Sequence, residues 1–127
     1  MVEVKIIEDT QATQNLYSEN GISYSTDISC AIAAKDTQEI LGYCLFDITK
    51  DKMTIKLIHP QDDIVMADSL LRSALFIAAN RQIIDVFWES PVTFELIDRL
   101  GFVKNAENNA IDVTNLFSSC KNCENNN

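Results

Sequence analysis

Two side chains with the chemistry of a proton acceptor stand where apolar runs of the sequence end. His59 is the only histidine and follows the run MTIKLI, and Glu89 follows the run IIDVFW. Imidazole and carboxylate groups are the usual general bases of enzymes, so either residue is a candidate catalytic group. The plainer alternatives are a surface histidine that marks the end of a strand and a carboxylate that favours the start of a helix.

The four cysteines fall into two kinds. Cys30 and Cys44 lie in apolar runs, which favours small buried residues over chemistry. Cys120 and Cys123 form the motif CKNC, which has the spacing of half a zinc site or of a redox pair. A structural zinc needs four ligands and the chain offers no second pair, so we predict no metal site. An inert tail, a metal or intermolecular site such as a homodimer could form, and a redox pair are the three interpretations of CKNC.

Length and composition set the class of protein. The chain has 127 residues, 46% of them hydrophobic, which suits one domain over 1–117 and a polar tail over 118–127. No apolar run reaches the ~20 residues of a membrane span, and the N-terminus does not resemble a signal peptide. We therefore expect a cytoplasmic protein without a membrane partner. The net charge of -9, with scattered Lys and Arg, argues against nucleic acid as a partner.

The hydrophobic pattern predicts the elements that position these residues. Strands are expected around VEVKIIED, ISCAIAAKD, ILGYCLFDITK, MTIKLIHP, IIDVFWE and AIDVTNLF, with KNAENN as a turn. A long helix is predicted from Asp63 to Arg81, and a later helix has Ser90 as its N-cap and Pro91 at its first position. A short helix with Thr10 as its cap lies near the N-terminus. The strand, helix and strand in the middle of the chain predict a right-handed crossover between parallel strands. The predicted fold class is α/β: a mixed, mostly antiparallel sheet with one parallel pair and helices on both faces.

In this order, three segments resemble the GNAT superfamily of acyltransferases. EILGYCLFDI resembles the family's third strand, in which I-x-G-Y recurs. IHP followed by DSLLRSALFIAANRQIIDVFWE resembles the fourth strand, pyrophosphate loop, long helix and fifth strand, and SPVTFELIDRLGF resembles the next helix. The resemblance covers about residues 28–102. It implies a splayed parallel strand pair and acyl transfer from acetyl-CoA, as co-substrate, to an amine of a small molecule or a protein.

The resemblance also implies roles for individual residues. The coenzyme is expected at the N-terminal end of the long helix, between the strands that end at His59 and Glu89. One of these two residues would take the proton of the amine. The residues expected to contact the coenzyme are Ile58, Val65, Met66, Ala67, Asp68 and Ser90.

Several positions depart from the family's pattern. The pyrophosphate loop of the family is written Gln/Arg-x-x-Gly-x-Gly/Ala, and its glycines let backbone N–H groups approach the phosphates. Here Val65 and Ala67 take the glycine positions, and Asp62 and Asp63 bring negative charge. Ile97 replaces a tyrosine that protonates the leaving thiolate. The first third of the chain has room for only one short helix where the family has two.

Two hypotheses of different class follow. The first is an acyl-CoA-dependent N-acyltransferase, whose acidic surface favours a cationic acceptor. The second is a degenerate module of the same fold that binds a partner or a small ligand and transfers nothing, because a fold does not determine a function. A third, a small dimerising protein, would give the cysteine motif an intermolecular role, and a homodimer is one of the expectations.

Overall fold

Within residues 1–116, the part of the chain that the computed structural model describes, seven strands form one sheet. The strands are β1 (Val2–Ile6), β2 (Ser29–Asp36), β3 (Glu39–Ile48), β4 (Lys52–His59), β5 (Asp85–Trp88), β6 (Val103–Asn105) and β7 (Ala110–Ile111). Their order across the sheet is β1-β2-β3-β4-β5-β7-β6, and each neighbouring pair is antiparallel except β4 and β5. The predicted fold class is confirmed. Cys120 and Cys123 lie outside the described residues.

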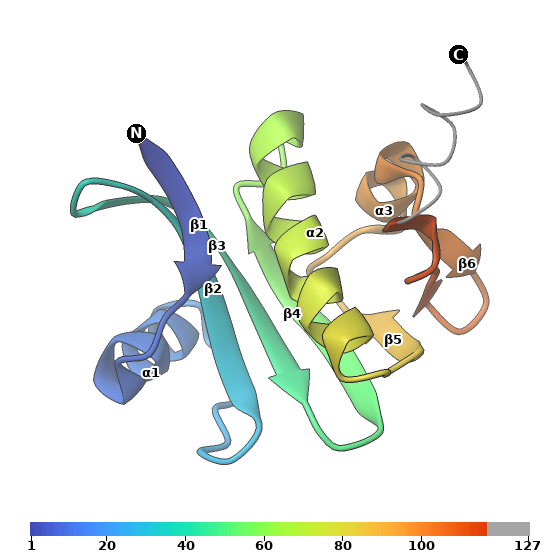
Figure 1. Cartoon of the computed structure of the whole chain (residues 1–127), viewed down its shortest axis with the longest axis horizontal. Coiled ribbons are helices and arrows are strands. Elements are labelled where there is room, and N and C mark those ends of the chain that lie inside the picture. Colours follow the sequence, from blue (N-terminus) through green and yellow to red (C-terminus); the bar gives the residue numbers. More distant parts are fainter. Residues whose placement is uncertain (117–127) are drawn as a thin grey trace.

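Helices cover both faces of the sheet (Figure 1). They are α1 (Thr10–Glu19), α2 (Ile64–Asn80) and α3 (Phe94–Leu100). α1 packs on one face through Leu16 and Tyr17, which form a small core cluster with Ala31, Leu45 and Leu57. α2 and α3 both contribute to the larger cluster on the opposite face. None of the helices in the described residues is long and apolar enough to cross a membrane.

The long helix α2 follows closely from the sequence. Its N-cap is Asp63, whose side chain accepts a hydrogen bond from the Met66 N–H at 3.1 Å. The buried positions recur at helical spacing and are Ala67, Leu70, Leu71, Ala74, Leu75 and Ala78. The observed helix is one residue shorter at each end than the predicted range. It connects β4 to β5, which are parallel as predicted.

The predicted start of α3 is wrong. Thr93, not Ser90, is the N-cap, and its hydroxyl accepts a hydrogen bond from the Leu96 N–H at 3.2 Å. Before the helix, the chain makes a turn in which the Val92 N–H donates to the Glu89 carbonyl at 3.0 Å. This turn buries Val92 in the larger core cluster, so the helix begins only after it.

Near the ends of the chain, one local prediction is wrong and another is right only in part. Asp9, not Thr10, caps α1, because its carboxylate accepts a hydrogen bond from the Gln11 N–H at 2.9 Å. Residues 106–109 form the turn predicted over KNAENN, whereas its first two residues, Lys104 and Asn105, belong to β6, in which Val103 lies opposite Ile111. A strand of three residues is too short to show an alternating pattern, so its pairing depends on tertiary contacts.

The core holds two ionisable groups away from water. Tyr17 is fully buried, and burial, reinforced by the charge of Asp47, raises the pKa of its hydroxyl well above the ordinary value. Cys44 is also fully buried, and burial raises the pKa of its thiol to about 12. The folded protein therefore keeps both groups neutral well into the alkaline range.

We expect the protein to lose stability as the pH rises above about 9. An unfolded chain releases the Cys44 proton near pH 9.0, whereas the folded chain retains it to about pH 12. Between these values the unfolded state gains up to about 1.4 kcal/mol per pH unit from this group. Tyr17 adds to the loss above its ordinary value of 10.0. Urea unfolding at increasing pH measures how steeply the free energy of unfolding falls with pH. The fall should be shallower for Cys44→Ala than for the wild type. Equal falls would contradict the attribution of this loss to Cys44.

Candidate active site

The parallel strands β4 and β5 pair over part of their length and then diverge. Ile55 lies opposite Trp88, and the Glu89 N–H donates to the Ile55 carbonyl at 3.0 Å. Residues 56–59 of β4 have no partner on β5. We use the word gap for the region between the separating strands, from its narrow end at Glu89 to its open end at His59 and the loop leading into α2.

The open end of this gap is bridged by one side chain. Gln61 Nε2 donates to the Pro91 carbonyl at 3.1 Å, which links the loop after β4 to the loop after β5. Gln61 Oε1 is buried without a hydrogen-bond partner. A hollow of about 190 Å³ beside the bridge is lined by Gln61, Ile64, Thr93, Glu95, Leu96 and Arg99. Binding sites for drug-sized ligands hold roughly 300 to 1,000 Å³, so a coenzyme would have to move Gln61 aside.

Some backbone N–H groups in the first turn of α2 already donate hydrogen bonds within the chain. The Met66 N–H donates to the Asp63 carboxylate at 3.1 Å, and the Ala67 N–H donates to the Asp63 carbonyl at 2.8 Å. Val65 is at a position whose N–H has no partner within the helix, and its side chain is 78% exposed. The Asp68 carboxylate forms an ion pair within the helix at 3.0 Å. The Asp63 carboxylate thus occupies the place at the helix N-terminus that suits a phosphate.

His59 and Glu89 lie on the same face of the sheet but apart from one another. His59 is opposite Tyr43, with ring centroids 5.1 Å apart, and Tyr43 packs against the core cluster under α1. Ile58 is buried on the opposite face, under α2. Trp88 is also buried on the α2 face, so strand alternation directs Glu89 to the α1 face. Allowing for the extra residue of a bulge in β4, His59 is two strand steps beyond the level of Glu89, which corresponds to about 7 Å along the strand.

A bulge in β4 lies at the narrow end of the gap. The register between β3 and β4 shifts so that Leu45 lies opposite Leu57 and Phe46 lies opposite Ile55. This leaves Lys56 as an extra residue, so that Lys56 and the next residue, Leu57, both lie on the α1 face. Lys56 therefore enters the polar contacts under α1 beside the divergence of β4 and β5.

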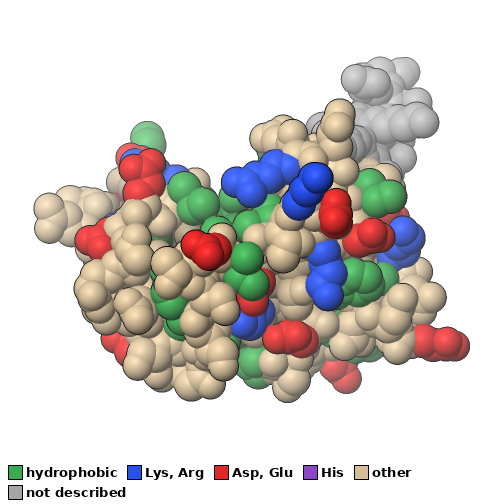
Figure 2. Space-filling view, turned by 90° about the horizontal axis from the view of Figure 1, so that it is seen from below, with side chains coloured by type: hydrophobic (Ala, Val, Ile, Leu, Met, Phe, Trp, Pro, Cys, Tyr) green, Lys and Arg blue, Asp and Glu red, His purple; other side chains and the backbone are tan. Residues whose placement is uncertain are grey.

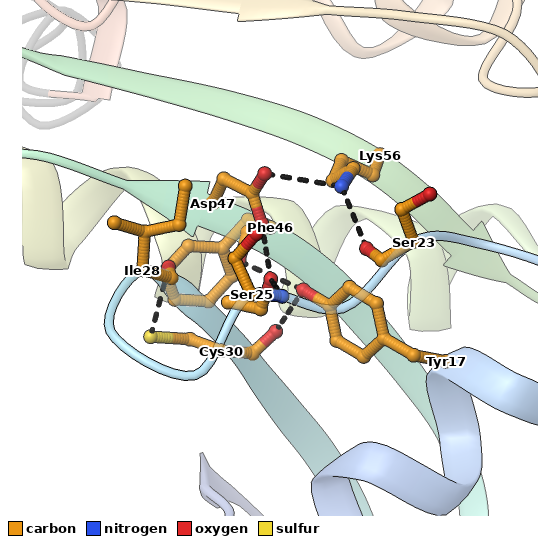
Figure 3. A network of polar contacts seen from close by, with 9 residues as sticks. Tyr17, Ser23, Ser25, Ile28, Cys30, Phe46, Asp47 and Lys56 are labelled. Carbon is orange, nitrogen blue, oxygen red and sulfur yellow. Dashed lines mark hydrogen bonds and ion pairs between the residues drawn. The ribbon is translucent and has the colours of Figure 1, made fainter.

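A polar cluster surrounds this lysine (Figure 3). Lys56 Nζ lies 3.0 Å from the Asp47 carboxylate and donates to the Ser23 carbonyl at 3.1 Å. Ser29 Oγ donates to the other Asp47 oxygen at 2.7 Å, and the Tyr17 hydroxyl donates to two strand carbonyl groups at 2.8 and 2.9 Å. Both oxygens of Asp47 are engaged, so the cluster supports this face of the sheet and does not supply a free base.

Several residues at the gap were missed from the sequence. Gln61 and Lys56 belong to no recognisable sequence motif. Gln61 contributes through a contact between two loops, and Lys56 contributes at a bulge in β4. Arg99 is exposed at the hollow and makes no ion pair within residues 1–116. Ser90, expected to contact the coenzyme, lies in the exposed turn between β5 and α3. In the part of the chain that the structure describes, no group of three His, Cys, Asp or Glu side chains could hold a metal ion.

No protein-family model and no curated protein matches the sequence, whereas many solved structures match the fold. A predicted acetyltransferase of Clostridium acetobutylicum, solved with acetyl-CoA, is 15% identical with a TM-score of 0.61, and the match covers 84% of this chain and 93% of that one. The ribosomal-protein-alanine N-acetyltransferase of Brucella melitensis is 11% identical with a TM-score of 0.59, covering 82% and 93%. An aminoglycoside acetyltransferase from a soil metagenome is 16% identical with a TM-score of 0.56, covering 84% and 94%. The chain therefore has the fold of the GNAT acetyltransferases, as the resemblance implied.

Proposed function

We propose that the protein is an acyl-CoA-dependent N-acyltransferase that moves an acetyl group to an amine. The observation that carries the proposal is the gap between β4 and β5, which opens beyond Ile55 and Trp88 and leads to the N-terminus of α2. A thin ligand in this gap would lie against unpaired β4 backbone, with one end at the helix N–H groups. The neighbour solved with acetyl-CoA has the same fold, which supports this class of ligand.

The pyrophosphate of the coenzyme would lie at the first turn of α2. The N–H group of Val65 is available there, and that of Met66 becomes available once Asp63 turns away. Ala67 contributes mainly a small side chain, because its N–H already bonds within the chain. Arg99 at the adjacent hollow would offset part of the negative charge of this loop. These features support binding weaker than that of a glycine-rich loop.

The transfer step needs a base beside the thioester. The amine nitrogen attacks the thioester carbonyl, the new N–C bond forms, the C–S bond breaks, and the amine loses a proton. With the phosphates at α2, the thioester would reach the narrow end of the gap, next to Glu89. His59 would border the ligand about 7 Å nearer the phosphates. Glu89 is therefore the proposed proton acceptor, and the leaving thiolate would take its proton from water, since Ile97 has none to donate.

The amine would enter from the α1 face of the sheet. Glu89 is directed to this face, and residues 20–28 form no helix over it. The net charge of -9 favours a cationic acceptor, which a small-molecule amine and a protein amine both satisfy. Ribosomal-protein alanine and aminoglycosides, which appear in the names of two structural neighbours, are therefore the first acceptors to try.

Calorimetric titration of acetyl-CoA into the reduced protein tests the proposal. We expect a Kd of about 50 μM and its loss in Val65→Glu, while the uncharged control Val65→Gln keeps it. Both substitutions are at an exposed side chain, so the fold is maintained. Asp63→Asn retains a capping oxygen but removes the competing charge, and should bind several-fold more tightly. Absence of heat at about 1 mM coenzyme from both wild type and Asp63→Asn would overturn coenzyme binding.

A second candidate function is a binding module of this fold that transfers nothing. It is favoured by the Asp63 carboxylate bonded to the Met66 N–H and by the Gln61 bridge across the gap. Mass spectrometry of amines incubated with acetyl-CoA and protein separates the two functions. An acetylated product supports the transferase, whereas coenzyme binding without product across the amines supports the module.

A further inference from the structure

β1 is an open edge of the sheet. It pairs with β2 on one side, where Val2 lies opposite Asp36 and Ile6 lies opposite Ile32, and no strand in residues 1–116 pairs with its other side. An unpaired strand edge presents a row of N–H and C=O groups to which another strand can bond. The residues of β1 therefore decide what this edge can meet.

Alternate residues of β1 direct their backbone groups to the open edge. The Ile7 N–H donates to the Ala31 carbonyl at 2.8 Å, which makes these two residues a hydrogen-bonded pair. Such pairs alternate with non-bonded pairs along an antiparallel ladder, so Glu3 and Lys5 also bond to β2. The residues whose N–H and C=O groups point outwards are therefore Val2, Val4 and Ile6.

We propose that β1 pairs antiparallel with β1 of a second copy of this chain, about a two-fold axis at Val4. In this register Val4 lies opposite Val4 of the partner subunit. Val2 lies opposite Ile6 of the partner subunit, and Ile6 lies opposite Val2 of the partner subunit. Each pair exchanges two hydrogen bonds between outward-directed groups. Both open β1 edges are used, so the assembly closes as a dimer.

The charges of β1 select this register. Glu3 lies opposite Lys5 of the partner subunit and Lys5 opposite Glu3 of the partner subunit, at non-hydrogen-bonded positions where side chains are closest. In one chain, Lys5 and Glu3 are 72% and 63% exposed and pair with each other at 3.2 Å. A two-fold axis at Glu3 or at Lys5 would instead place like charges opposite. The axis at Val4 is thus the one that matches charge as well as backbone.

The apolar face of β1 extends the same contact. Val4 packs against the core under α2, and a groove of about 390 Å³ runs between β1 and α2. Its lining includes Ile6 and Phe76, which are 41% and 53% exposed. Figure 2 shows hydrophobic side chains on this side of the molecule, with Lys and Arg side chains beside them. A two-fold axis perpendicular to the sheet would join the two grooves between the two α2 helices and bury apolar surface there.

Sedimentation equilibrium of the full chain tests this pairing, in reductant and chelator so that the CKNC motif cannot link copies. Wild type should dimerise with a Kd below about 100 μM. Lys5→Glu places like charges opposite at two symmetric positions and should raise the Kd at least about tenfold. The double variant Glu3→Lys, Lys5→Glu restores opposite charges and should return the Kd to within about threefold of wild type.

Val4→Pro is an independent test of the backbone pairing. The Val4 N–H points to the open edge, so proline removes no hydrogen bond to β2, and edge positions tolerate it. We expect a monomer with the circular dichroism of the wild type. Three results would overturn the proposal: a monomeric wild type at about 1 mM, a dimer that Val4→Pro leaves intact, or a double charge variant as weak as Lys5→Glu.

Discussion

Replacing Tyr17 with alanine is expected to lower the free energy of unfolding by about 4 kcal/mol. The side chain is fully buried between α1 and the sheet, and its ring contacts Tyr24 edge-on at 5.4 Å and Lys56 Nζ at 5.5 Å. Its hydroxyl donates to the carbonyl groups of Cys30 and Phe46, which lie opposite each other on β2 and β3. Alanine would leave a cavity and remove the donor shared by these two carbonyl groups.

Tyr17→Phe is the matched control, because it keeps the ring and removes only the hydroxyl. It should cost about 1 to 2 kcal/mol, as expected for a buried hydrogen bond. Urea unfolding of both variants at neutral pH, where the hydroxyl is neutral, measures the two losses. A cost below about 1 kcal/mol for Tyr17→Ala would show that α1 does not dock through this residue. Equal costs for both variants would mean that the ring contributes nothing.

Glu89→Gln is expected to lower kcat at least about 100-fold for the acceptor that the protein acetylates. Glutamine has nearly the same shape but cannot take the proton of the attacking amine. The backbone hydrogen bond from residue 89 to the Ile55 carbonyl is retained, so the divergence of β4 and β5 is unchanged. Mass spectrometric measurement of product formation gives the rate. Acetyl-CoA binding by calorimetry should stay within about twofold of wild type, which separates the chemical step from binding.

His59→Gln tests whether His59, the other candidate base, takes the proton in place of Glu89. The imidazole lies about 7 Å along β4 from the level of Glu89 and packs against Tyr43, so we expect kcat to change by less than about threefold. If His59→Gln abolished transfer and Glu89→Gln did not, the thioester would lie at the open end of the gap. The orientation of the coenzyme proposed here would then be reversed.

Short-range patterns were sufficient for the elements that enclose the gap. Asp63, one of the two adjacent aspartates that precede the apolar periodicity, caps α2, and Gly101 adopts the left-handed conformation (φ 85°) that ends α3. Ser90 shows where this approach fails. It has the residue type of an N-cap and precedes a proline, yet burial of Val92 delays the helix to Thr93. A cap signal is local, whereas the burial that overrides it depends on the core.

Residue patterns alone predicted the fold class, the α2 crossover between parallel strands and the glycine-free, acidic loop at the start of α2. The bridge from Gln61 to Pro91, the ion pair of Lys56 with Asp47 and the separation of His59 from Glu89 are seen only in the folded chain. The physical reason is range. Caps and helical periodicity join residues within about four positions, whereas the Gln61–Pro91 contact spans 30. Such contacts depend on strand order, register and a one-residue bulge, which no local pattern encodes.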